Sequence, residues 1–226
     1  MLDSTNICTY ILVLWYTYNG TYYQRVSYAK ACYIVNGGEN MIHVGTKEIE
    51  TERLNLRKFI GSDTNAAFKN WCSDDNVTKF LTWPTHVNLS ITEAILKDWI
   101  KSYEKENFYQ WAIVLKDTNE LIGSISIVSI HDKTNSVEIG YCIGTNWWNK
   151  GFVSEAFSAL ITFMFEEMKV NRVEAHHDTN NPNSGKVMMK CGLKYEGTLR
   201  QSDFNNQGIV DASYYSILAN EYFTDI

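Results

Sequence analysis

Three apolar segments separated by short polar turns constrain the fold of this chain more than any other feature. The segments are "FYQWAIVL" (108–115), "LIGSISIV" (121–128) and "SVEIGYCI" (136–143), and the turns between them contain "KDTNE" and "HDKTN". The segments are rich in β-branched and aromatic residues, and short turns join antiparallel neighbours. The sequence therefore predicts an antiparallel meander of three strands in the middle of the chain.

Helices and strands are expected on both sides of the meander. A strand is predicted in "IETERLNLRKF" (49–59), followed by helices at roughly 63–73 and 90–104, the second with a capping box of Ser90 and Glu93. After the meander we expect a helix at 152–167, a strand at 171–177, a short helix from Pro182 to before Gly192 with Asn181 as its N-cap, and strands at 193–203 and 209–219. This order predicts an α/β domain with a mixed, mostly antiparallel sheet.

The acidic balance of the chain narrows the classes of partner. A net charge of −6 and a sequence pI near 5.4 argue against direct binding of nucleic acid through its phosphates. The same excess suits a cationic partner such as an amine. The apolar run "ICTYILVLWYTY" (7–18) is shorter than the about 20 residues that span a bilayer and follows no basic leader, so no membrane anchor or signal peptide is expected.

The cysteines indicate the compartment. The chain has 226 residues and five scattered cysteines that form no Cys-x-x-Cys pair. This usage is typical of reduced thiols and predicts a cytoplasmic protein. A chain of this length holds a sizeable core without disulfides or a metal.

The first 40 residues differ from the rest, because they are rich in tyrosine, poor in acidic residues and without a sustained helix or strand period. The segment "NGGENM" (36–41) back-translates, with permitted codons, to AAT GGA GGA GAA AAT ATG, a purine-rich ribosome-binding sequence before a start codon. Two interpretations stay open. Residues 1–40 are a non-native leader before a natural start at Met41, or they are an N-terminal arm of the single domain at 41–226.

The stretch "IGTNWWNKGFVSEAF" (143–157) breaks a strand and then begins a helix. A helix N-terminus presents unpaired N–H groups and partial positive charge, so it suits an anion. Gly151 lets the backbone approach a ligand closely and Lys150 adds charge, which predicts a site for a phosphate or pyrophosphate. An ordinary loop with a glycine turn explains the same residues. The Gly-x-x-x-x-Gly-Lys-Ser/Thr signature of a phosphate-loop nucleotidase is absent from the sequence.

Five segments together resemble the GNAT superfamily of N-acetyltransferases, and within it the ribosomal-protein N-acetyltransferase (RimJ/RimL-like) branch. They are, in chain order, "IETERLNLR", "YQWAIVLKDTNELIGSISI", "EIGYCIGTNWWNKGFVSEA", "NPNSGKVMMKCGLKYEGTLR" and "DASYYSIL". The resemblance covers about 49–223. It implies the acyl-CoA N-acyltransferase fold, a splay between the strands at 136–143 and 171–177, and direct transfer of the acetyl group of acetyl-CoA to a primary amine.

The resemblance also implies which residues hold acetyl-CoA. The family's loop, Gln/Arg-x-x-Gly-x-Gly/Ala, aligns with 148–153, so the glycine is kept at Gly151 while Trp148, Asn149 and Val153 depart from the family pattern. The departures leave the backbone N–H donors in place. The implied cofactor-binding residues are Cys142, Ile143, Trp148, Asn149, Lys150, Gly151, Phe152, Val153, Ser154, Asn181 and Ser184.

Two residues are candidates for proton transfer. The resemblance places Ser184 near the CoA sulfur, and many family members use a tyrosine as the acid at the position of Met188, which has no proton to donate. Ser184 is therefore the local candidate for the acid, and capping of a helix explains it as well. Glu138, on the strand before the loop, is the candidate base for the amine. The alternative for Glu138 is a strand carboxylate paired with a lysine or arginine.

A metal site is not expected. His176, His177 and Asp178 are adjacent, but neighbouring strand residues point to opposite faces, so both histidines cannot easily bind one ion.

The acceptor stays open at the level of sequence. The interpretation is an acetyl-CoA-dependent N-acetyltransferase that acts on a peptide N-terminus or a small amine. The alternatives are a polyamine- or aminoglycoside-type small-molecule acetyltransferase and a non-catalytic acyl-CoA-binding sensor that keeps the fold. In this family the segment "TWPTHVN" (82–88) falls where the acceptor site is shaped. The sequence does not fix the oligomeric state and leaves a homodimer open.

Overall fold

The computed structural model describes residues 12–18, 21–27 and 41–224, with side chains from residue 41 onward. It divides into two units, Met1–Gly38 and Glu39–Ile226. In the first unit, strands β1 (Leu12–Tyr18) and β2 (Thr21–Ser27) pair antiparallel, although the sequence shows no sustained strand period there. The leader-or-arm prediction falls mainly on residues outside the described ranges. Among the described residues, no helix is long and apolar enough to cross a membrane.

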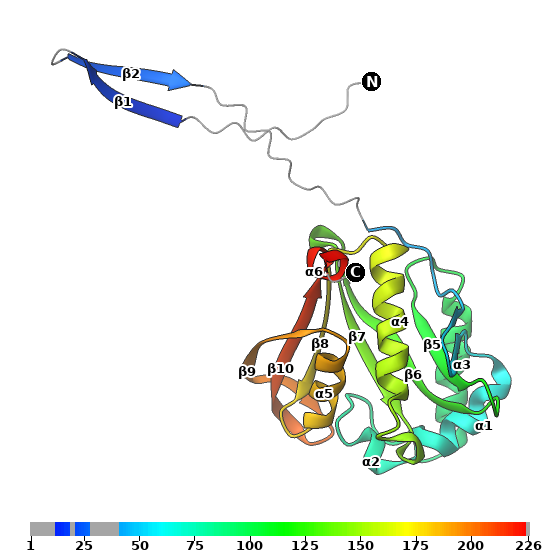
Figure 1. The fold of residues 1–226 in the computed structure, drawn as a ribbon. Helices are drawn as coiled ribbons and strands as arrows, with labels where there is room; N and C mark the ends of the chain where they lie inside the picture. The colour runs from blue at the N-terminus through cyan, green and yellow to red at the C-terminus, as the bar shows by residue number, and fades with distance from the viewer. Residues whose placement is uncertain (1–11, 19–20, 28–40, 225–226) are drawn as a thin grey trace. The chain divides into compact units, whose positions relative to one another are not determined.

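A mixed sheet of eight strands organises the second unit (Figure 1), in the spatial order β3-β4-β5-β6-β7-β8-β10-β9. The strands are β3 (Ile49–Glu50), β4 (Leu54–Arg57), β5 (Gln110–Leu115), β6 (Leu121–His131), β7 (Ser136–Ile143), β8 (Arg172–Asp178), β9 (Lys194–Asn205) and β10 (Gly208–Leu218). β7 and β8 are parallel, and the other neighbouring pairs described in this sheet are antiparallel. The predicted meander and the α/β fold with a mostly antiparallel sheet are confirmed.

Helices cover both faces of this sheet. On one face lie α4 (Phe152–Glu166) and α5 (Pro182–Lys190), which follow the two parallel strands. On the other lie η1 (Gly61–Asp63), α1 (Thr64–Ala67), the π-helical turn η2 (Phe68–Cys72), α2 (Asp75–Thr78) and α3 (Leu89–Ser102). Short helices η3 (Asp132–Thr134), η4 (Thr145–Trp147) and α6 (Ala219–Thr224) lie in connections or at the end. The sheet is therefore the middle layer of three.

Two apolar cores follow from this layering. Trp111 and Ile113 of β5 pack with Phe157 and Leu160 of α4 in one core, and all four side chains are completely buried. The second core joins the opposite face of the sheet to α1–α3. All six residues of β5 are buried, which explains why this strand reads as a continuous apolar run instead of an alternating one.

The predicted capping box at the start of the helix at 90–104 is wrong. α3 begins at Leu89, with Asn88 as its N-cap residue. Ser90 Oγ donates to Asn88 Oδ1 over 2.5 Å, and Glu93 pairs with Lys97 one turn later. The Asn88 side chain makes no capping hydrogen bond to the backbone of α3 in the described structure, and its oxygen accepts from Ser90 instead.

Candidate active site

β7 and β8 pair over three residues and then diverge. Their parallel pairing runs from Ser136 with Arg172 to Glu138 with Glu174, although both strands continue for several residues. Beyond this point, the backbone groups of β7 that face β8 have no strand partner among the described residues. The expected splay is confirmed. Backbone N–H and C=O groups require partners, so the opening is suited to a ligand with amide groups of its own.

The loop after β7 turns sharply into the N-terminus of α4. Asn149 and Gly151 adopt left-handed conformations, with φ of 61° and 80°. Trp147 is buried in the core, and Trp148 Nε1 donates to Ile143 O over 2.9 Å. Both tryptophans therefore hold the loop in place. The first N–H groups of α4 have no intrahelical acceptor, which is the backbone geometry that an anion site requires.

Two cations from distant parts of the chain flank Gly151. A Cβ atom placed on Gly151 would lie 3.6 Å from Arg53 Nη2 and 3.7 Å from Lys190 Nζ. Arg53 Nη1 also donates to Lys150 O over 3.1 Å, which ties β4 and the preceding turn to the loop. Sequence reasoning missed Arg53 and Lys190, because neither is near the loop in the chain. The available signal was Glu155, an acidic residue in the first turn of α4 that requires a cationic partner.

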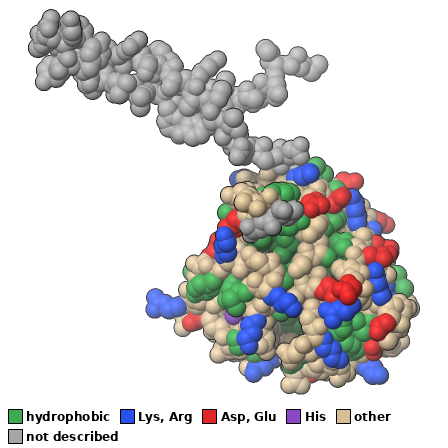
Figure 2. All heavy atoms as spheres, viewed as in Figure 1, with side chains coloured by type: hydrophobic (Ala, Val, Ile, Leu, Met, Phe, Trp, Pro, Cys, Tyr) green, Lys and Arg blue, Asp and Glu red, His purple; other side chains and the backbone are tan. Residues whose placement is uncertain are grey.

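Glu155 fixes Arg53 beside the loop. Its Oε2 lies 2.6 Å from Arg53 Nε, and its Oε1 accepts from Thr51 Oγ1 and Arg53 N. Partial burial alone would raise the pKa of Glu155, but the hydrogen bonds from Thr51 and Arg53 lower it below its ordinary value. Lys and Arg side chains gather at the end of the domain where α4 begins, in the lower part of Figure 2. The loop therefore lies in a positively charged environment.

Cys142, Ile143 and Ser154 can offer a ligand their backbone but not their side chains. The Cys142 thiol lies 3.3 Å from Ser124 Oγ, and burial raises its pKa, so it stays protonated. Ile143 and Ser154 are buried. The side chain of Phe152 lies under the Arg53 guanidinium, 4.5 Å from its ring centroid to the Cζ atom.

Asn181 and Ser184 come together at the start of α5. Asn181 is the N-cap residue, and its Nδ2 donates to Ser184 Oγ over 3.1 Å. The hydroxyl keeps its own proton for donation, since a serine oxygen can accept and donate at once. Tyr141 donates its hydroxyl to Ser184 O over 3.1 Å, and burial raises the pKa of this phenol. Met188, in the place of the family's usual tyrosine, is buried in the core.

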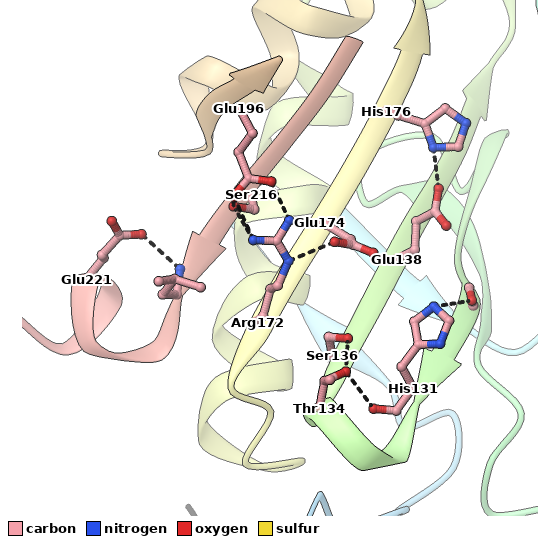
Figure 3. Close-up of polar contacts among 12 residues, drawn as sticks. His131, Thr134, Ser136, Glu138, Arg172, Glu174, His176, Glu196, Ser216 and Glu221 are labelled. Carbon is pink, nitrogen blue, oxygen red and sulfur yellow. Dashed lines mark hydrogen bonds and ion pairs between the residues drawn. The ribbon is translucent and has the colours of Figure 1, made fainter. Parts of the chain in front are cut away.

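Glu138 faces the opposite side of the sheet from Ser184, toward α1–α3. Its Oε1 lies 2.5 Å from His176 Nδ1 on β8, and the two side chains point toward one another (Figure 3). His176 Nε2 lies 3.0 Å from Asp203 Oδ2 on β9. The carboxylate of Glu138 raises the pKa of His176 against the effect of burial, and Asp203 adds to the rise. Glu138 is thus a paired strand carboxylate, as in the alternative interpretation, but the partner described is a histidine and not a lysine or arginine.

Arg172 neutralises two further carboxylates on this face. Its guanidinium binds Glu174 Oε2 at 2.7 Å and Glu196 Oε2 at 2.5 Å, and it donates to Ser216 Oγ (Figure 3). The hydrogen bond from Arg172 lowers the pKa of Glu196 to about 2. In the described residues no group of three His, Cys, Asp or Glu side chains is arranged to hold a metal ion.

The β9–β10 turn closes this face at one end. Asn206 Nδ2 donates to Thr78 O over 2.9 Å and to Trp83 O over 2.8 Å, and Asn206 N donates to Leu81 O. The segment 82–88 is thereby joined to the hairpin that carries Asp203. The surface around Glu138 is thus assembled from elements far apart in the sequence.

Known proteins are similar to this chain in sequence and fold. A model of the acetyltransferase (GNAT) domain matches residues 53–194. "Uncharacterized N-acetyltransferase YoaA" of Bacillus subtilis (strain 168) is 31% identical over 170 residues, which are 75% of this chain and 96% of that protein. The ribosomal-protein-serine acetyltransferase of Escherichia coli (strain K12) is 32% identical over 136 residues, 60% of this chain and 75% of that protein. The crystal structure of an acetyltransferase (GNAT family) from Bacillus anthracis has a TM-score of 0.68 and 28% identity, and covers 77% of this chain and 100% of that one.

The matched region contains the cofactor-side elements described above and Glu138 and His176, but not the β9–β10 hairpin that carries Asp203. Residues 53–194 include Arg53, the splayed strands, the loop before α4, and the helix of Asn181 and Ser184. Relatives named as ribosomal-protein acetyltransferases stand at moderate identity to it. Fold, site and relatives lead to one conclusion: the chain belongs to the GNAT family, and it is an acetyl-CoA-dependent N-acetyltransferase.

Proposed function

We propose that this enzyme acetylates one primary amine, at a peptide N-terminus or on a small molecule, with Glu138 as the base and Ser184 as the acid. One observation carries the proposal. A loop suited to a phosphate lies at the open end of the β7–β8 splay, and a carboxylate, Glu138, lies where the two strands meet. A ligand that follows the splay from the loop therefore approaches Glu138.

The cofactor half of the site supports a pyrophosphate at the start of α4. The N–H groups of 152–154 would donate to it, and Arg53, Lys150 and Lys190 would balance its charge. The pantetheine arm would bind the open strand edges with its amides, next to Asn181. The remaining cofactor-binding residues of the loop act through their backbone, which agrees with the buried or anchored side chains found there.

The reaction needs a neutral amine and a protonated leaving group. Glu138 would remove a proton from the acceptor ammonium, and the nitrogen would attack the thioester carbonyl, which backbone N–H groups polarise. As the C–S bond breaks, Ser184 Oγ–H would supply a proton to the thiolate. Tyr141 supports this role indirectly, because its bond to Ser184 O fixes the first turn of α5 against β7.

The charges around Glu138 favour a single ammonium group. Glu174 and Glu196 are bound to Arg172, so they are not available to a second cationic group. A polyamine or aminoglycoside carries several cations and finds few free carboxylates here. The Escherichia coli relative is named a ribosomal-protein-serine acetyltransferase. This name supports a peptide N-terminus as the first acceptor to test.

An acceptor panel tests the proposal. Thiol release from acetyl-CoA would be followed with peptide N-termini, polyamines and aminoglycosides, each at several concentrations. We expect release that depends on a peptide amine, and mass spectrometry should locate one acetyl group on the α-amine. Calorimetric binding of acetyl-CoA without release for any amine would instead identify a non-catalytic sensor.

A cytoplasmic location is part of the same proposal. The described cysteines Cys72, Cys142 and Cys191 are free thiols, as expected in a reducing compartment. Fractionation of cells that express the chain with its native ends would test the location.

A further inference from the structure

We propose that His176 and Asp203 complete the base of this enzyme as positioning residues. His176 takes up, through Glu138, the proton that the acceptor amine loses, and Asp203 orients the imidazole that makes this transfer feasible. The inference rests on the proposed function, and it adds two residues for which the sequence alone indicates no catalytic role.

The contacts of the ring define one tautomer. His176 Nε2 lies 3.0 Å from Asp203 Oδ2, and a carboxylate can only accept at that distance, so the neutral ring carries its proton on Nε2. Glu138 Oε1 lies 2.5 Å from Nδ1, so the two atoms share one proton in the arrangement seen, which is the state after Glu138 has taken up the proton of the amine; Nδ1 of the neutral ring is the atom that accepts this proton. Tyr214 fixes the ring plane from β10, with centroids 5.0 Å apart and an interplanar angle of 29°. A carboxylate that orients an imidazole in this way is a recurring device in acid–base catalysis.

The protons balance. The acceptor enters as an ammonium and leaves as an amide, so its nitrogen loses two protons while one N–C bond forms and one C–S bond breaks. One proton neutralises the CoA thiolate. The other passes from the ammonium to Glu138 and from Glu138 to His176 Nδ1, which yields an imidazolium between two carboxylates. The His176 side chain is 25% exposed, so the imidazolium can return its proton to water after each turnover.

Two neighbours dominate the charge at the ring. Glu138 on β7 and Asp203 on β9 contact its two nitrogens. On β8 itself, Glu174 and Asp178 share the face of His176, but Glu174 binds Arg172 and Asp178 Oδ2 accepts from Asn205 Nδ2. Removal of Asp203 should therefore change the proton affinity of His176 more than any other single neutralisation outside Glu138.

The neighbouring strands β10 and β6 contribute neutral groups to this face. β10 contributes the phenol of Tyr214, whose pKa burial raises, so it is uncharged near neutral pH. β6 contributes Ser129, which lies opposite Glu138 in the sheet. These surroundings leave the two carboxylates as the causes of the raised pKa of His176, and the ring becomes competent to accept a proton as the pH rises through that pKa.

The pH dependence of kcat/KM provides the test. Because the neutral form of His176 accepts the proton, activity should rise with pH through the His176 pKa. Asp203→Asn removes one carboxylate, lowers that pKa and should move the rising limb to lower pH by about one unit, the low end of the span for a neighbouring opposite charge. His176→Gln should lower kcat/KM by about tenfold or more at neutral pH and abolish that limb.

NMR titration of the His176 imidazole in the ligand-free protein gives a readout independent of activity. It should show a pKa above the ordinary value, and a lower one in Asp203→Asn. Asp211→Asn is the matched control, since Asp211 lies on the same hairpin but accepts from Gln201 N instead of His176. It should move neither the NMR pKa nor the limb.

Three results would overturn the inference. In an active enzyme, a limb that stays in place in Asp203→Asn while the NMR pKa falls would remove His176 from the proton path and leave the proposed function intact. A wild-type chain that acetylates no amine would overturn both, whatever the NMR titration gives. A His176 pKa at or below the ordinary value would also contradict the proposed proton transfer from Glu138 to His176.

Discussion

The two ends of the β7–β8 splay present different chemical groups. At the open end, the loop before α4 offers backbone N–H groups, two left-handed residues and cations around Gly151. At the closed end, Glu138, His176 and Asp203 form a network of side chains from three strands. Backbone donors survive many side-chain changes, whereas a network of three groups fails when one is changed. The open end, where we propose that the cofactor binds (the cofactor end), should therefore tolerate side-chain substitutions. The closed end, where we propose that the amine binds (the acceptor end), should not.

Glu138→Gln should have the largest effect, because it removes the carboxylate that we propose as the base. We expect kcat/KM to fall by roughly 10²–10⁴, the usual span for general acid–base catalysis, with acetyl-CoA affinity unchanged. Glu174→Gln is the matched control, because Glu174 is the residue opposite on β8 and binds Arg172. Equal losses in the two variants would mean that Glu138 acts only through the charge of the face.

Ser184→Ala tests whether the cofactor end also contributes chemistry. The thiolate would lose its proton donor, so kcat should fall at least about tenfold with little change in acetyl-CoA affinity. Ser90→Ala, which also removes a serine from the first turn of a helix, controls for capping. If Ser184→Ala keeps full kcat when chemistry limits turnover, the proton comes from water or another residue and Ser184 is structural.

Gly151→Val should weaken acetyl-CoA binding by about tenfold, as expected for a backbone strain of 1–3 kcal/mol at a φ of 80°. Calorimetric titration measures the affinity. Gly208→Val is the matched control, because Gly208 has a φ of 100° in the β9–β10 turn and open space around it. It should cost stability but not affinity, and unchanged affinity in a folded Gly151→Val variant would contradict the assignment of the loop.

The smallest effect is expected from removal of residues 1–40, because neither end of the splay uses a described residue before 41. The described contacts of the domain begin with Met41 N, 3.3 Å from Asn135 Oδ1, and Ile42 N, which donates to Met168 O. A chain of 41–226 should bind acetyl-CoA equally and melt within about 2–4 °C of the full chain, a change on the order of 1 kcal/mol. A much larger loss would identify an integral arm.

The elements at the open end of the splay could be predicted from the sequence because they are contiguous. The strand, the loop with Gly151 and the helix that follows lie within one stretch, and Asn181 opens the next helix as expected. Arg53 was missed, since it reaches Gly151 only after β4 takes its place in the sheet and Glu155 fixes the guanidinium. A short sequence motif does not reveal a contact between residues that are distant in the sequence.

At the closed end the sequence points to Glu138 alone, for the same reason. His176 stands beside His177 and Asp178 in the sequence, which suggests only a metal site, and the side chains of these neighbours do not lie together. Its partners are Glu138 and Asp203, which the parallel register of β7 with β8 and the β9–β10 hairpin bring to the same face. Strand alternation explains why His176 and His177 have separate surroundings, but the register that selects the partners is a property of the whole sheet.

The short pairing of β7 with β8 has a consequence for how this enzyme resists heat. Three residue pairs between β7 and β8 join the two halves of the sheet. A bound pantetheine arm would form hydrogen bonds to both strands along the rest of the opening, as an added strand does. By mass action, a ligand that binds the folded state alone at a hundred times its Kd adds about 2.7 kcal/mol to the free energy of unfolding. The melting temperature of this protein should therefore follow the concentration of acetyl-CoA, and the thermal survival of the enzyme in a cell would depend on the supply of its own co-substrate.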